Sequence, residues 1–331
     1  DFINLSNDVT KQYIPYQHQE LEKMKESIVD IGMNSEFNIG DIKVNFVNAG
    51  HMPGSVSVSI EGEGKRVVYT GDINSSDQNL VKGADTKYGE VDLLITESTY
   101  GVNDHPDRED VEEEFVSFAK DVTERGGTLL VPAFAVGRSQ EIACVLKSHN
   151  YSLPVAMDGM ALKTNRILLE NLEFLGDSEL FKQMINGLTE AKNWKQRKEI
   201  MNTPGVIIVP AGMMVGGLSS YYKGSIAMNE KNAISLVSYQ AEGTPGRTLL
   251  EKKMIKVDGK LKKIKGKFEH FNFSSHSGSK QLFEMIDGIK GNPTIVAVHG
   301  EEEQATSFVK KVQKDYGYDA IAPELGDKII I

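Results

Sequence analysis

The sequence contains a single cysteine, Cys144, among its 331 residues. One thiol cannot form a disulfide within the chain or build a cysteine-rich zinc ribbon, so both kinds of scaffold are excluded. Any metal bound by these residues must therefore be held by histidine and carboxylate side chains.

Positive charge is also scarce. The chain has 37 Lys and Arg residues against 47 Asp and Glu residues, which gives a formal net charge of −10 at pH 7. A chain with this net charge does not attract nucleic acids over its whole surface, so any nucleic-acid binding must come from a local basic patch. The segment 252–267 is the exception, with eight lysines around the turn Asp258-Gly259. We interpret it as an exposed hairpin that extends a nucleic-acid track, binds a partner or keeps a sheet edge soluble.

Long apolar runs are absent as well. No segment approaches the roughly 18 to 20 apolar residues that cross a bilayer, and the first residues lack the pattern of a secretion signal. We therefore expect no membrane contact and a cytoplasmic location. The sequence opens at Asp1, within a polar segment ahead of an expected helix, and we expect it to be a fragment of a longer protein.

The regular patterns predict an α/β protein large enough for two domains. The short segment 61–64, which contains two glycines, predicts a hairpin turn between two strands. After residue 128, strands and helices alternate, which predicts a parallel sheet covered by helices. Strands are expected at 42–47, 56–60, 67–69, 91–95, 128–131, 206–209, 234–237, 269–273, 294–298 and 328–331. Helices are expected at 17–31, 107–122, 139–148, 165–173, 178–185, 280–289 and 301–316.

Histidine and carboxylate side chains, which can bind metals or transfer protons, lie at the ends of several of these strands. His51, Asp72, Glu97 and His299 follow or close four apolar strands, and His276 lies between a fifth strand and a helix. Because the carboxyl ends of neighbouring strands meet at one edge of an α/β sheet, we expect these residues to lie close together. A single histidine of this kind is often only a structural residue, and an Asp after Gly is often only a turn former. The repetition favours a metal site, because zinc prefers imidazole and carboxylate ligands.

Seven motifs in the sequence resemble those of the β-CASP branch of the metallo-β-lactamase superfamily. The third, fourth and A motifs of that branch are matched by Ala49-Gly-His-Met-Pro-Gly-Ser55, Tyr69-Thr-Gly-Asp72 and Thr96-Glu-Ser-Thr-Tyr-Gly101. Its β-CASP signatures and its B and C motifs are matched, in the right order, by Val131-Pro-Ala-Phe-Ala-Val-Gly-Arg-Ser-Gln-Glu141, Pro210-Ala-Gly-Met-Met-Val-Gly-Gly217, Phe273-Ser-Ser-His276 and Val298-His-Gly-Glu301. The resemblance runs nearly end to end. It points most closely to archaeal and bacterial relatives of the cleavage and polyadenylation factor nuclease and of ribonuclease J.

The resemblance implies a metallo-β-lactamase αββα sandwich with an inserted β-CASP α/β domain. The expected segments are 1–102 and 256–331 for the lactamase-like domain and 103–255 for the insertion. The implied activity is that of a zinc-dependent ribonuclease of RNA processing or decay, with two Zn²⁺ ions in an intact site. His51 would bind the first zinc, His299 the second, and Asp72 both.

The same resemblance implies roles for the remaining candidates. Glu97 would orient His276, which would act as the general acid for the leaving oxygen. Single-stranded RNA is the implied partner, and a homodimer is left open. Phosphate contacts are expected from the start of the helix after residue 137 and from the glycine-rich loop, at Arg138, Ser139, Gly216, Gly217 and Ser219.

The sequence departs from the family pattern in one respect. The His-x-His-x-Asp-His motif, which supplies four metal ligands, is not found in these residues. We expect a truncated nuclease, which alone would bind metal weakly and cleave poorly; the alternative is a noncatalytic RNA-binding scaffold subunit. A DNA-directed nuclease is a further alternative, although His299 at the motif C position favours RNA. Endonuclease and 5′-to-3′ exonuclease modes share these motifs, so the sequence leaves both open.

Overall fold

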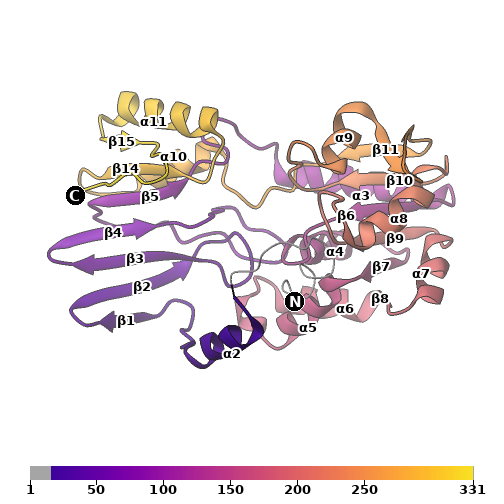
Figure 1. The fold of residues 1–331 in the computed structure, drawn as a ribbon, viewed down its shortest axis with the longest axis horizontal. Coiled ribbons are helices and arrows are strands. Elements are labelled where there is room, and N and C mark those ends of the chain that lie inside the picture. Colours follow the sequence, from indigo (N-terminus) through magenta and orange to yellow (C-terminus); the bar gives the residue numbers. More distant parts are fainter. Residues whose placement is uncertain (1–15, 331) are drawn as a thin grey trace.

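The strands of the protein form two main sheets, each in its own α/β body (Figure 1). The computed structural model describes residues 16–330. The first sheet has seven strands in the order β1-β2-β3-β4-β5-β14-β15, and the second has six in the order β13-β10-β6-β9-β7-β8. Strands β11 and β12 form a separate pair. The expected α/β class with an inserted domain is confirmed by this arrangement.

The first sheet is antiparallel at one side and parallel at the other. Strands β1 to β4 pair antiparallel, whereas β4, β5, β14 and β15 pair parallel. Helices α10 and α11 pack on this sheet and bury residues such as Leu94, Leu282 and Phe308. The bounds are β1 (Glu36–Ile39), β2 (Ile42–Asn48), β3 (Val56–Gly62), β4 (Lys65–Tyr69), β5 (Leu93–Glu97), β14 (Thr294–Val298), β15 (Ala320–Ile321), α10 (Ser279–Asp287) and α11 (Glu302–Tyr316).

The second sheet is parallel throughout, as the sequence predicts. Its central strands are continuous apolar runs because helices cover both faces, and all five residues of β9 are buried. The strands are β6 (Thr128–Pro132), β7 (Val155–Asp158), β8 (Leu188–Ala191), β9 (Gly205–Val209), β10 (Ala233–Leu236) and β13 (Lys267–His270). The helices are α3 (Arg108–Glu124), α4 (Arg138–Ser148), α5 (Met160–Leu169), α6 (Ser178–Gly187), α7 (Trp194–Met201), α8 (Gly217–Ala227) and α9 (Pro245–Lys252).

Several local expectations differ from the structure. The strand expected at 328–331 is wrong for residues 328–330, which have no regular structure, and Ile331 lies outside the described residues. The helix expected at 17–31 is α2 (His18–Glu26) and ends early. Helix α8 begins where the glycines of the sequence indicate a loop. Gly216 stands at the N-cap of α8 with a φ of 66°, a conformation that glycine adopts without strain.

The expected domain boundary at residue 256 stays a prediction, and the chain after it still contributes a strand to the second sheet. Strand β13 pairs with β10 in the second sheet, with Ala233 opposite Lys267. The hairpin of β11 (Met254–Val257) and β12 (Lys260–Lys263) precedes it and packs on α8 and α9 of the same body. The hairpin expected from the lysine-rich segment is thus present, and β13, which ends at His270, pairs within the second sheet.

Within residues 16–330, none of the helices has both the length and the apolar character that a membrane span requires.

Candidate metal and catalytic site

All five predicted catalytic and metal-binding side chains meet at one edge of the first sheet. His51 and Asp72 follow β2 and β4, Glu97 ends β5, and His299 follows β14. Strands β5 and β14 are parallel neighbours with Glu97 opposite Val298, so their carboxyl ends lie together. The expectation from the strand ends is confirmed as a spatial cluster.

Asp72 lies between two histidines. Its Oδ2 is 3.8 Å from Nε2 of His51, and its Oδ1 is 3.4 Å from Nε2 of His299. Each carboxylate oxygen thus faces a different imidazole. This arrangement suits a carboxylate that is shared between two metal ions.

His51 is held in the form that binds metals. Its Nδ1 lies 2.9 Å from the carbonyl oxygen of Ser275, which can only accept, so the proton is on Nδ1 and the Nε2 lone pair is free. Burial lowers the pKa of His51, and the nearby His276 lowers it further. Both effects favour the neutral imidazole, which is the ligand form.

His276 is fixed by a buried carboxylate. Its Nδ1 lies 2.9 and 2.8 Å from the two oxygens of Glu97, whose side chain is 0% exposed. The backbone N–H of Ile73 also donates to Glu97 Oε1 at 2.6 Å. Because Nδ1 is engaged, Nε2 is the nitrogen of His276 that remains for a ligand, a substrate or a metal.

The spatial grouping differs in one residue from the predicted ligand set. Among residues 16–330, the side chains whose ligand atoms all lie within 4.8 Å of one another are those of His51, Asp72 and His276. His299 contacts the other oxygen of Asp72 and stacks on His276, with ring centroids 5.7 Å apart. Imidazole and carboxylate ligands fit zinc. Both His276 and His299 lie where they could add an imidazole ligand to the pair of His51 and Asp72.

The backbone at His299 is unusual. His299 has a φ of 47°, in the left-handed region, and Gly300 follows it. A Cβ on Gly300 would lie 2.5 Å from Oγ of Ser98, so only glycine fits there. Thr99 donates to the His299 carbonyl oxygen at 2.9 Å, which ties the two loops together. The strand-end rule does not indicate these supporting residues.

The predicted RNA-contact residues are only partly at the surface. Ser139 and Ser219 are fully buried, and their hydroxyls donate to the carbonyl oxygens of Phe134 and Gly216. These two serines stabilise their own loops. Gly216 and Gly217 are exposed, with positive φ angles. Contact between RNA and any of these residues stays a prediction.

Arg138 connects the two bodies. It is 8% exposed, and its Nη1 and Nη2 donate to the carbonyl oxygen of Val237 at 3.1 Å and to Ser275 Oγ at 3.0 Å. Burial lowers its pKa to about 10, so the guanidinium stays charged at neutral pH. Since Ser275 precedes His276 and also contacts His51, Arg138 supports the loop that carries the site. Phosphate contact by Arg138 stays a prediction.

Glu141, one helical turn after Arg138 on α4, also links the two bodies. Its two oxygens accept the backbone N–H groups of Asn79 at 3.1 Å and Leu80 at 2.7 Å, and Oε1 also accepts from Arg108. Glu141 is 2% exposed. It therefore anchors the loop that follows Asp72 to the second body. No pattern in the sequence indicates this contact, because the partners lie 62 residues apart.

Replacing Arg138 with alanine should lower the free energy of unfolding by about 1 to 3 kcal/mol, because the buried carbonyl oxygen of Val237 and the partly buried Oγ of Ser275 lose their donor. Chemical denaturation measures this, with Arg247→Ala as the matched control. Arg247 is more exposed and pairs with Glu251 one turn away on α9; its loss should change stability by less than about 0.5 kcal/mol. A stability equal to that of the control variant would contradict the supporting role.

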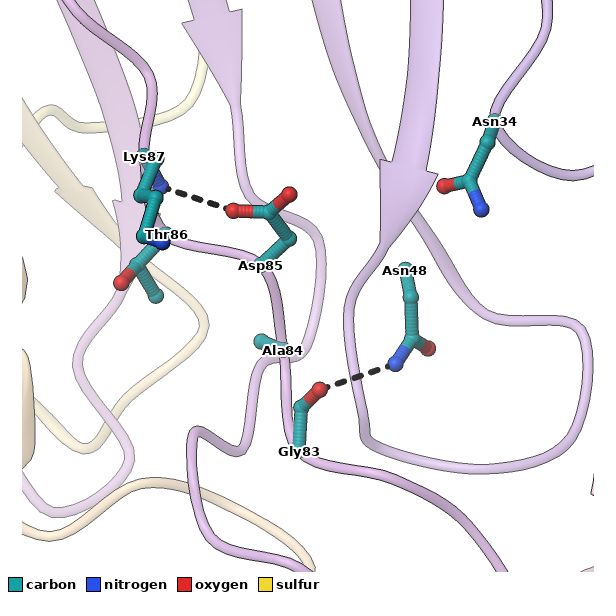
Figure 2. A pocket seen from close by; sticks show the side chains of 7 residues that line it. All are labelled: Asn34, Asn48, Gly83, Ala84, Asp85, Thr86 and Lys87. Atoms are coloured by element: carbon teal, nitrogen blue, oxygen red, sulfur yellow. Dashed lines mark hydrogen bonds between the residues drawn. The ribbon is translucent and has the colours of Figure 1, made fainter. Parts of the chain in front are cut away.

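Two of the hollows among residues 16–330 lie on the first body. One is lined by His51 and Asp72 together with residues 52–56 and Tyr69. The other, shown in Figure 2, is lined by Asn34, Asn48, Asp85, Lys87 and their neighbours. In it, the Asn48 amide donates to the Gly83 carbonyl oxygen and the Lys87 N–H to Asp85. No histidine or cysteine lines the second hollow, so the first is the candidate reaction site.

Comparisons with known proteins agree with this geometry. Two family models match, the Beta-Casp domain over residues 139–249 and the Zn-dependent metallo-hydrolase RNA specificity domain over residues 262–323. A solved structure titled a protein of unknown function from Enterococcus faecalis covers 92% of this chain and 67% of its own, with a TM-score of 0.59 and 16% identity, which shows the fold alone.

Three curated relatives are similar over nearly the whole chain. "RNase aCSPSF2" of Saccharolobus solfataricus is 39% identical, with 99% of this chain and 66% of the relative covered. "Probable RNase MJ4" of Methanocaldococcus jannaschii is 36% identical, with 100% and 78% covered. "Transcription termination factor FttA" of the same organism is 34% identical, with 98% and 55% covered. The chain thus spans between 55% and 78% of the lengths of these relatives.

Proposed function

The chain belongs to the β-CASP ribonucleases of the metallo-β-lactamase superfamily, and from that premise we propose that it forms the catalytic cleft of a metal-dependent hydrolase of RNA phosphodiester bonds. The observation that carries the proposal is the placement of Asp72 between His51 and His299, with the His276–Glu97 pair beside it. A metal-dependent nuclease uses both parts, ligands that hold the metal and a donor that protonates the leaving oxygen.

The metal would be zinc, held by His51, Asp72 and His299, with two ions per intact site. Bound zinc supplies Lewis-acid stabilisation of the negative charge that develops on the phosphoryl oxygens. Asp72 is the residue suited to serve both ions, because its oxygens face different histidines. Further ligands are expected from the family's His-x-His-x-Asp-His motif.

His276 would act on the leaving group. Glu97 holds Nδ1, so a proton on Nε2 points away from Glu97 and is available to the oxygen that leaves the cleaved phosphodiester. As the oxygen of a hydroxide ion bonds to phosphorus and the P–O bond to the leaving oxygen breaks, the proton passes from Nε2 to that leaving oxygen, and the imidazolium becomes neutral imidazole. The negative charge of Glu97 stabilises the imidazolium before transfer.

The natural full-length protein should cleave a labelled single-stranded RNA and should cleave DNA of the same sequence at least about tenfold more slowly, a difference of about 1.4 kcal/mol in barrier. A chelator should stop cleavage, and added zinc should restore it.

Each other result assigns a different function. Equal cleavage of RNA and DNA would indicate a DNA-directed or unselective nuclease. RNA binding without cleavage, in protein that holds no zinc, would indicate the noncatalytic scaffold. Both results would contradict the proposal.

A further inference from the structure

The lysine-rich hairpin lies outside the candidate site and has no role in it. We define the basic hairpin as residues 252–267, which comprise β11, β12 and the segments that flank them. Figure 1 shows β11 beside α9 on the second body. Strands β11 and β12 pair only with each other among the described strands. Nothing in the catalytic arrangement uses this element, so its charge needs a separate explanation.

The basic hairpin is fixed on one side and open on the other. Ile255 is 1% exposed and belongs to the core cluster that includes Tyr222 and Ile226 of α8. The Lys265 N–H donates to the carbonyl oxygen of Ala227 at 2.8 Å. The lysines of the outer face are held on a folded support, and they are not the ends of a loose tail.

Most lysines of the basic hairpin have no acidic partner. Within the described part of the chain, Lys262 lies 3.8 Å from Asp258 and Lys267 lies 2.7 Å from Asp121. The remaining lysines have no carboxylate within 4.0 Å among residues 16–330, and all are exposed: Lys252, Lys253, Lys256, Lys260, Lys263 and Lys265. A chain with a net charge of −10 thus concentrates unneutralised positive charge in one element.

This concentration is stronger than solubility requires. Edge strands are kept soluble by a few charges, and soluble surfaces mix both signs. Burial lowers the pKa of Lys223 of α8, and the charge of Lys256 lowers it further, so Lys223 lies within the positive field of the basic hairpin. Like charges repel one another at this site, and a polyanion would relieve the repulsion.

Helix α8 leads from the cleft to the basic hairpin. Gly216 caps α8 and Gly217 is its first residue, and both follow the loop after β9. A Cβ on Gly212 in that loop would lie 3.2 Å from the backbone of Phe134. The loop of Phe134 in turn reaches the site, because a Cβ on Gly137 would lie 3.4 Å from Met52. The 11-residue helix then spans about 16 Å to Ala227, which contacts the basic hairpin.

We propose that the basic hairpin is a second RNA contact, which holds the phosphate backbone of a strand that leaves the cleft along α8. The contact takes no part in cleavage and binds phosphates of any sequence, as point charges on lysine do. It rests on the proposed function, since it assumes that the strand in the cleft is RNA. Only strands long enough to pass along α8 would reach it.

The test compares two triple variants of the full-length protein. Lys256→Gln, Lys260→Gln and Lys263→Gln together alter the basic hairpin. Lys290→Gln, Lys310→Gln and Lys314→Gln together remove the same charge from exposed positions on the first body. Binding to RNA of about 5 and about 20 nucleotides is measured with a chelator present, over a range of salt concentrations. Unfolding curves confirm that both variants are folded.

For the longer RNA, the basic-hairpin variant should bind more weakly, with a slope of log K against log salt reduced by about 2, at roughly 0.7 per phosphate contact. Its binding to the short RNA should match that of the unmodified protein. The control variant should change neither, and Lys→Arg at the three hairpin positions should preserve the slope. A hairpin variant with an unchanged slope on the longer RNA would overturn the inference and leave an acidic protein as the partner to seek.

The two proposals can fail separately. An unmodified protein that cleaves RNA, together with a hairpin variant that has an unchanged slope, would overturn only the hairpin contact. A protein that does not cleave RNA but loses salt-dependent binding in the hairpin variant would overturn only the nuclease.

Discussion

Alanine in place of Asp72 should abolish RNA cleavage and lower the zinc content of the protein. The carboxylate faces His51 on one side and His299 on the other, so one substitution removes a ligand from both expected metal positions. If the lost stabilisation of the reacting group is about 4 kcal/mol, cleavage falls about 10³-fold. Single-turnover cleavage and metal analysis of the same preparation measure the two effects together.

Asp85→Ala is the matched control for this variant. Asp85 is an exposed carboxylate of the other hollow on the same body, and it contacts no histidine in the described residues. Its loss should leave both cleavage and zinc content near those of the unmodified protein. Cleavage by the Asp72 variant at the rate of the Asp85 control would remove Asp72 from the site.

The second large effect is expected at His276. His276→Ala should lower turnover by roughly 10² to 10⁴, the usual contribution of a general acid, while zinc content stays near that of the unmodified protein. Glu97→Gln should lower turnover less, because the ring keeps a hydrogen-bonding neighbour but loses its charged one. Cleavage rates and metal content decide between the roles.

The two roles of His276 give opposite metal contents. The proximity of His276 to His51 and Asp72 would also suit a metal ligand. If His276→Ala loses zinc in parallel with activity, the residue is a ligand and the proton donor must be sought elsewhere. If turnover and zinc content are both unchanged, His276 has neither role.

The sequence is informative where chemistry depends on position along a strand. Apolar strands are visible in the sequence, and the parallel pairing of β4, β5 and β14 brings Asp72, Glu97 and His299 to one edge. Strand β2 runs in the same direction as β4 with the antiparallel β3 between them, so His51 reaches the same edge. The sequence is less informative about the direction in which a side chain points. Ser139 has the right type for a phosphate contact, but its hydroxyl points into the loop, and residue type alone does not determine that.

Contacts between the two bodies are beyond sequence reasoning. Arg138 meets Ser275 across 137 residues, and Glu141 meets Asn79 across 62. Neither pair follows a period of 2 or 3.6, which are the only spacings that single-sequence patterns report. Both contacts start from α4, so this helix positions the loops after Asp72 and before His276.

The pairing of β5 with β14 also determines when the proposed site can be complete during synthesis of the chain. Ser98, after β5, donates to the carbonyl oxygen of Val298 at the end of β14, 200 residues later. At a translation rate of about 5 to 20 residues per second, roughly 10 to 40 s separate the two. Until the second strand emerges, a nascent chain carries Asp72 and Glu97 without His299. If the proposed function holds, the message being translated therefore meets no completed site on its own ribosome until β14 and the loop after it have been made.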